Sequence, residues 1–166
     1  MELEKITAKT YLNSLSILHA SLIMGQVLIA GIFYFFGTAG NAPLSAVEAG
    51  AQKEFYLVGA AVILGVLASA QLFGTKVRNL AQVKDLKEKL AGYRAALILR
   101  YMLLEVPSLL AIFFYFITDN AFLLIFSGMI LILFWLYRPT KERLITDLEL
   151  NAAEQQHINN PDAIIN

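Results

Sequence analysis

The sequence contains no cysteine and few charged residues. Without cysteine there is no disulfide framework, no thiolate nucleophile and no Cys-ligated zinc or iron–sulfur site. Only 16% of the 166 residues are charged, whereas 58% are hydrophobic. This composition leaves too little polar surface for a soluble domain of this length. We therefore expect one integral membrane domain.

The residue sets that catalysis and nucleic-acid binding require are also missing. The formal net charge is zero and there is no basic tail. We find no membrane Ser or Thr paired with a buried base, no pair of membrane aspartates, no metal-ligand spacing and no glycine-rich phosphate loop. The two histidines, His19 and His157, are far apart, so haem or zinc ligation by both would need an oligomer. We predict a protein that is not an enzyme, has no cofactor or metal and binds no nucleic acid.

Long apolar runs are what the sequence does contain. About 20 apolar residues cross a bilayer core of roughly 30 Å as a helix. The chain offers four such runs, at residues 15–36, 55–73, 95–117 and 121–137. Lipid cannot satisfy open backbone groups, so runs of this length are expected to be helices. The sequence predicts an all-α integral membrane protein with four transmembrane helices.

The first and third runs resemble each other. Residues 17–36 and 98–117 match at eight of twenty positions without a gap. The third run is internal and the first exceeds the apolar core of a signal peptide, about 7 to 15 residues, so we expect the first run to be retained. We predict two repeated hairpins, at 15–75 and 95–137, the second closed by a tight turn at 118–120.

A second match lies just past the second and fourth runs. Residues 74–78 have the sequence GTKVR, and residues 139–143 have the sequence PTKER, so the two sites share the pattern T-K-x-R. In each copy we expect the breaker, Gly74 or Pro139, to end the run, and the following Thr75 or Thr140 to cap a new helix.

The basic residues predict the orientation of the chain. Segment 76–94 carries six Lys and Arg residues, segment 1–14 carries two and segment 138–150 carries three, whereas the other two connections between runs carry only Lys53. Because Lys and Arg concentrate on the cytoplasmic side, both termini are expected in the cytoplasm, in the plasma (inner) membrane. The two hairpins are then parallel repeats related by an axis along the membrane normal.

The segments beyond the runs mix apolar and charged residues at helical spacing. We expect segment 76–94 to be a basic amphipathic linker and segment 138–150 an amphipathic cytoplasmic helix, either lying at the interface or extending a span. The tail at 151–166 is rich in Asn and Gln and is expected to be disordered. The repeated bases should contact anionic lipid or a partner protein. They are Lys76, Arg78, Lys141 and Arg143.

Glu105 is the leading candidate for a functional side chain. It lies about ten residues, or about 15 Å, into the third run, where a charged carboxylate costs roughly 2.5–3.5 kcal/mol. Tyr101, Glu105 and Ser108 share one helix face and could form a polar stripe, while Pro107 predicts a kink beside the acid. Two interpretations stay open: a proton- or cation-coupled relay, or an acid, protonated or paired with Arg100, that holds helices together.

Other polar and small residues lie within the runs. His19 aligns with Arg100, which suggests a polar site in the inner leaflet built by both halves. Gln26 can hydrogen-bond between helices. A stripe of small residues permits close helix contact, within the bundle or at a homodimer seam. It consists of Ala61, Gly65 and Ser69.

Two classes of function follow. The preferred one is a small non-enzymatic membrane protein, an accessory or assembly subunit that binds a membrane partner, a second copy of itself or anionic lipid. The alternative is a small oligomeric proton- or cation-coupled transporter or channel that uses Glu105.

Overall fold

A computed structural model describes residues 7–36 and 51–165 of the chain. Within these ranges the protein is all-helical, as the sequence predicts, apart from one isolated bridge between Thr7 and Ile164. Residues 1–6 of the predicted N-terminal segment and the connection at 37–50 lie outside the described residues. The helices are α1 (Ala8–Phe36), α2 (Ala51–Ala81), α3 (Leu86–Thr118), α4 (Leu123–Leu136), α5 (Lys141–Asp147) and α6 (Ala152–Asn159).

Helices α1, α2 and α3 are long and apolar enough to cross a membrane. Helix α4 has 14 residues, about 21 Å, which is less than a bilayer core of roughly 30 Å. It passes the same test only together with α5, to which it is bent by 82°. The described residues therefore supply three spans, or four if α4 and α5 count as one bent span.

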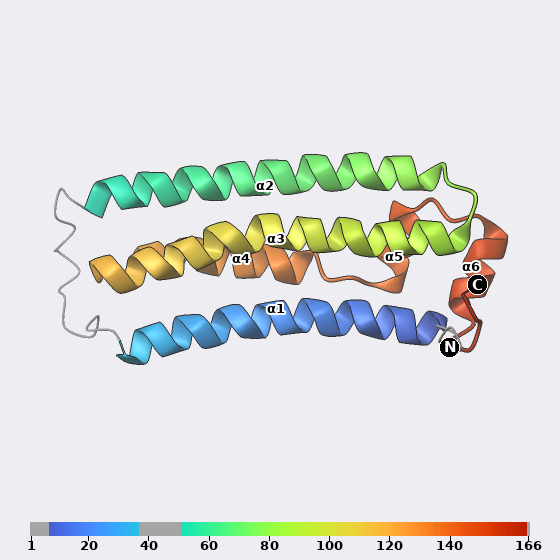
Figure 1. Cartoon of the computed structure of the whole chain (residues 1–166), viewed down its shortest axis with the longest axis horizontal. Coiled ribbons are helices and arrows are strands. Elements are labelled where there is room, and N and C mark those ends of the chain that lie inside the picture. The colour runs from blue at the N-terminus through green and yellow to red at the C-terminus, as the bar shows by residue number, and fades with distance from the viewer. Residues whose placement is uncertain (1–6, 37–50, 166) are drawn as a thin grey trace, which may run out of the picture.

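Helix α3 lies at the centre of the bundle. It packs against α1, α2 and α4, and its contact with α2 is the most extensive. Figure 1 shows α3 and α4 between α1 and α2. Of the two predicted hairpins, 95–137 is thus a packed pair of helices, whereas the two helices of 15–75 lie on opposite sides of the bundle.

The faces of the long helices differ as expected for a membrane protein. Helix α1 buries one narrow stripe, which recurs at helical spacing. This stripe consists of Ala8, Tyr11, Leu15, His19 and Gln26. The outward faces of α1 to α4 carry many large exposed apolar side chains, such as Leu64 and Ile132. A soluble protein rarely exposes so much apolar surface, so these helices suit a lipid environment.

The turn between α3 and α4 is tight, as the sequence predicts. Asp119 takes the left-handed conformation with φ of 57°, and its amide donates to the carbonyl of Tyr115 at 2.9 Å. The side-chain oxygen of Asn120 accepts from the amide of Phe122 at 3.1 Å. Short polar side chains tolerate such a backbone and bond to it locally, which closes the α3–α4 hairpin.

The linker at 76–94 is not a separate helix. It consists of the end of α2, a short break at 82–85 and the start of α3, where Asp85 accepts from the amide of Lys87 at 3.2 Å. The expectation that Gly74 ends a helix and Thr75 caps the next is wrong, because both lie inside α2. A single glycine costs a helix only about 1 kcal/mol, which favourable packing overrides.

The second T-K-x-R site behaves as predicted. Pro139 lies in the connection between α4 and α5, where its missing amide and the restriction on the preceding residue stop a helix. The hydroxyl oxygen of Thr140 accepts from the amide of Arg143 at 3.2 Å and caps α5.

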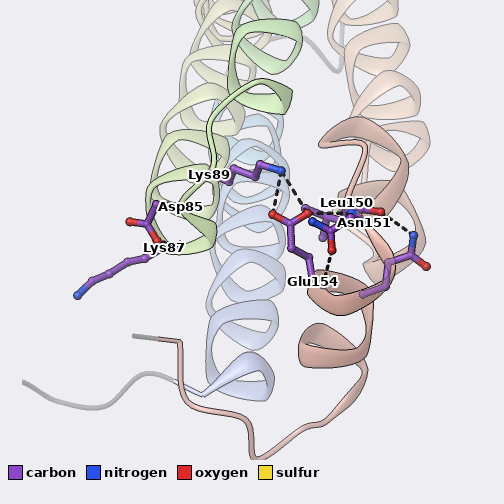
Figure 2. A network of polar contacts seen from close by, with 7 residues as sticks. Asp85, Lys87, Lys89, Leu150, Asn151 and Glu154 are labelled. Atoms are coloured by element: carbon purple, nitrogen blue, oxygen red, sulfur yellow. Dashed lines mark hydrogen bonds and ion pairs between the residues drawn. The ribbon is translucent and has the colours of Figure 1, made fainter.

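The tail at 151–166 is not disordered over its described part, which corrects our expectation. Asn151 and Glu154 form a capping box at the start of α6, with bonds of 3.0 and 2.8 Å. Figure 2 shows Lys89 of α3 reaching Glu154, at 2.9 and 3.2 Å from its two carboxylate oxygens. Ile158 of α6 is buried. Composition alone missed these specific contacts, which offset the entropy of ordering a polar segment.

The tail also closes over the start of α1. The amide of Ala8 donates to the carbonyl of Ala163 at 3.0 Å, and the amide of Lys9 donates to that of Pro161 at 3.2 Å. The first amides of a helix have no partner within it, so the tail satisfies two of them. We call the end of the bundle formed by the start of α1, the end of α2, residues 82–85, α5 and α6 the cap end (Figure 1).

Candidate functional site

A buried polar cluster joins three helices in the middle of the bundle. The hydroxyl of Ser108 on α3 donates to the side-chain oxygen of Gln26 on α1 at 2.8 Å, and it lies 2.8 Å from the hydroxyl of Ser127 on α4. All three residues are buried. Bonds of this kind hold membrane helices in register, so the interhelical role predicted for Gln26 is confirmed.

Sequence reasoning missed Ser127. A signal was present, because Ser127 is the only Ser or Thr between residues 121 and 137. The other polar atom of Gln26, its amide nitrogen, is buried without a partner among the described residues.

A second interior cluster is aromatic. The ring of Tyr101 lies 5.1 Å from that of His19 and 5.3 Å from that of Phe134, between centroids. The hydroxyl of Tyr101 donates to the carbonyl of Tyr137 at 3.1 Å. His19 thus contacts Tyr101 and Phe134 in the core, not the repeat-equivalent Arg100. The packing role of these rings is clear from their burial.

Glu105 lies apart from both clusters. It is half-buried, and no hydrogen bond or ion pair joins it to another residue within 7–36 or 51–165. Tyr101 bonds to Tyr137, the residue just after α4, and Ser108 bonds to Gln26 of α1. The structure therefore does not join Tyr101, Glu105 and Ser108 into one hydrogen-bonded stripe. It does not pair Glu105 with Arg100 either, because that guanidinium stacks on aromatic rings.

The proline of α3 meets a glycine of α2. Helix α3 continues through the buried Pro107, which cannot donate to the carbonyl of Leu103 four residues earlier. A Cβ on Gly65 would lie 2.6 Å from that carbonyl oxygen and 3.0 Å from Cγ of Pro107. Only glycine fits at this separation, so the small residue at 65 serves contact within the bundle.

A cavity of about 580 Å³ opens beside the cap end. It lies between α2, α3, α5 and the connection from α4 to α5. Its lining includes Phe73, Arg100, Tyr137, Thr140, Arg143 and Asp147. The guanidinium of Arg100 lies 4.4 Å from the ring centroid of Phe73 and 3.5 Å from that of Tyr137. That of Arg143 lies 5.9 Å from the ring of Tyr137.

The four bases predicted to contact lipid or a partner do not form two equivalent surfaces. Lys76 and Arg78 are exposed on continuous α2, whereas Lys141 and Arg143 are half-buried in α5. Beside them, the pKa of the Glu142 carboxyl is held below its ordinary value, mainly because its own amide donates to it and also because Thr140 bonds to it.

No protein family, curated protein or solved structure matches this chain. The part of the chain that the structure describes also contains no group of three or more acidic or histidine side chains placed to hold a metal ion. The contacts described above leave two candidate sites. One is Glu105, which bonds to no other described residue, and the other is the cavity lined by Arg100 and Arg143.

Proposed function

We propose that this protein is a small non-enzymatic membrane protein, an accessory or assembly subunit, that binds a membrane partner or anionic lipid through its cap end. The observation that carries the proposal is the folded polar cap, in which α6 is tied to α3 through Lys89 and Glu154 (Figure 2). The interior polar residues Gln26, Ser108 and Ser127 already bond to one another. An ordered cap that leaves Lys76 and Arg78 exposed suits a docking role.

The proposal includes a topology. Four spans, with α4 and its flanking residues as the fourth, form two parallel hairpin repeats with both termini in the cytoplasm. The start of α1 and helix α6 lie at the same end of the bundle (Figure 1), as an even number of crossings requires. The concentration of Lys and Arg at this end supports a cytoplasmic location and the plasma (inner) membrane.

The test uses the full chain extracted in native lipid. We expect a stoichiometric partner, a homo-oligomer or enriched anionic lipid, measured by mass and by lipid analysis. Replacing Lys76 and Arg78 together by Gln should weaken the association about tenfold or more, because each base near an anionic surface contributes about 1 kcal/mol. Lys53→Gln is the matched control, since Lys53 is exposed at the opposite end of α2. A monomer without partner or enriched lipid contradicts the proposal.

A second candidate function rests on Glu105. Its carboxyl is half-buried and makes no bond to the described residues, so it does not hold helices together there. This favours a proton- or cation-coupled transporter or channel. In reconstituted protein, Glu105→Gln should then abolish proton-driven flux or ion conductance. Unchanged flux and conductance in a folded variant would exclude this function.

A further inference from the structure

The arginine-lined cavity lies where lipid headgroups are expected. Phe73 and Tyr137, which line it, are the last residues of the apolar runs at 55–73 and 121–137. Trp135 is exposed nearby on α4, with the guanidinium of Arg138 5.9 Å from its ring. Aromatic rings and basic side chains gather at the level of the headgroups. A ligand of this cavity is therefore accessible from the membrane surface.

Arg100 presents unused hydrogen-bond donors. Its guanidinium carbon lies 4.4 Å from the ring centroid of Phe73 and 3.5 Å from that of Tyr137, and a cation–π contact of this kind uses no N–H hydrogen bond. Its Nε is buried without a partner among the described residues. A buried donor on a charged group destabilises the protein when it is left without a hydrogen-bond partner. Arg100 is thus held in one place with its donors free.

Two carboxylates, Asp147 and Glu142, line the same cavity, but neither accepts a hydrogen bond from Arg100 among the described residues. Asp147 accepts from the hydroxyl of Tyr93 at 2.9 Å, and the Glu142 carboxylate bonds to its own amide and to Thr140. Within the described ranges, neither carboxylate forms an ion pair with Arg100 or with Arg143. Both guanidinium groups lie against the ring of Tyr137. Two neighbouring cations thus share a cavity without an anionic partner.

We infer that this cavity binds the phosphate of a phospholipid headgroup between Arg100 and Arg143. The planar guanidinium donates two parallel bonds to phosphate oxygens, and its π faces can stack on rings at the same time. The acyl chains of the lipid would lie along the exposed apolar surface of the bundle. This inference rests on the lipid-binding form of the proposed function and names the residues and the chemical group involved.

Native mass spectrometry of the full chain, loaded with phosphatidylglycerol, tests the inference. The wild type should retain this lipid and not diacylglycerol, which has the same chains but no phosphate. Arg143→Gln should lower retention about tenfold, as expected when one charge-assisted bond is lost. Arg100→Lys should also lower it, since lysine keeps the charge but not the fork of donors. Arg94→Gln is the matched control, because Arg94 is exposed on α3 outside the cavity lining.

Each other outcome has a defined meaning. Equal retention of both lipids by the wild type, or equal retention of phosphatidylglycerol by Arg143→Gln and Arg94→Gln in folded protein, overturns the inference. If millimolar inorganic phosphate displaces the lipid, the site binds free phosphate, and the inference that it binds a phospholipid headgroup is overturned. If only the Lys76 and Arg78 double variant loses its partner or lipid, the proposed function stands and the cavity site fails. If only the cavity variants lose lipid, the cavity site stands and docking through the exposed bases fails.

Discussion

The aligned stretches in α1 and α3 have similar sequences but occupy different places in the bundle. Helix α1 buries five residues along one stripe, whereas α3 buries twelve and packs far more extensively, above all against α2. Tyr34 of α1 is 58% exposed, whereas the aligned Tyr115 of α3 is 1% exposed. The same residue therefore faces outward in one copy and inward in the other. The position of a helix in the bundle, more than its own sequence, decides which of its residues are buried.

The polar residues of the two aligned stretches also differ between the peripheral helix α1 and the central helix α3. Met24 of α1 is exposed, and its aligned residue Glu105 is half-buried at the edge of the packed face of α3. Gln26 of α1 and its aligned Pro107 are both buried, one in a hydrogen bond and the other against α2. The central helix thus carries the acid and the proline, while the peripheral helix contributes one amide.

The largest contrast is expected at the aligned tyrosines. Tyr115→Ala should lower the free energy of unfolding by about 3–5 kcal/mol, because it leaves a cavity in the core. Tyr34→Ala should change it by less than about 1 kcal/mol, because this ring faces outward. Thermal or detergent unfolding of both variants measures the difference. Equal losses would show that α1 is as central as α3.

The contact between α2 and α3 can be tested with two glycines of one helix. Gly65→Ala should destabilise the protein by about 1–3 kcal/mol, because the new methyl meets the carbonyl of Leu103. Gly74→Ala should stabilise it by up to about 1 kcal/mol, since nothing lies within 4 Å of its added methyl. The two changes in melting temperature should therefore have opposite signs. A stabilising Gly65→Ala would contradict the close approach of α2 to α3.

The polar link from α1 to α3 should contribute less. Ser108→Ala removes the bonds to Gln26 and Ser127, and interhelical bonds in membranes contribute about 0.6 kcal/mol on average and about 1.7 at most. Ser21→Ala on the exposed face of α1 is the control, with no expected effect. A double-mutant cycle with Gln26→Ala measures the coupling. Zero coupling would mean that the cluster does not tie α1 to α3.

The sequence was sufficient for the helices because composition and run length determine them. It also predicted the turn at 118–120 and the interhelical role of Gln26. It could not show that α3 lies between α1 and α2, because apolar faces against lipid and against protein have the same composition. The order of the tail depends on Lys89 and Glu154, which are 65 residues apart, and no local pattern reveals such a pair. The cavity joins residues from three parts of the chain and was missed for the same reason.

The smallest expected effect concerns the two T-K-x-R sites, which extend the comparison beyond the aligned helices. Thr140→Ala removes the cap of α5 and should cost about 0.5 kcal/mol, the low end for a cap, because α5 is short and superficial. Thr75→Ala lies within α2, where alanine is the better helix former, and should have no cost or a slight gain. Urea unfolding of both variants in mild detergent gives the two values. A loss at Thr75 equal to that at Thr140 would mean that the two sites are structurally equivalent, as the repeat alone predicts, and that the continuity of α2 through Gly74 is wrong.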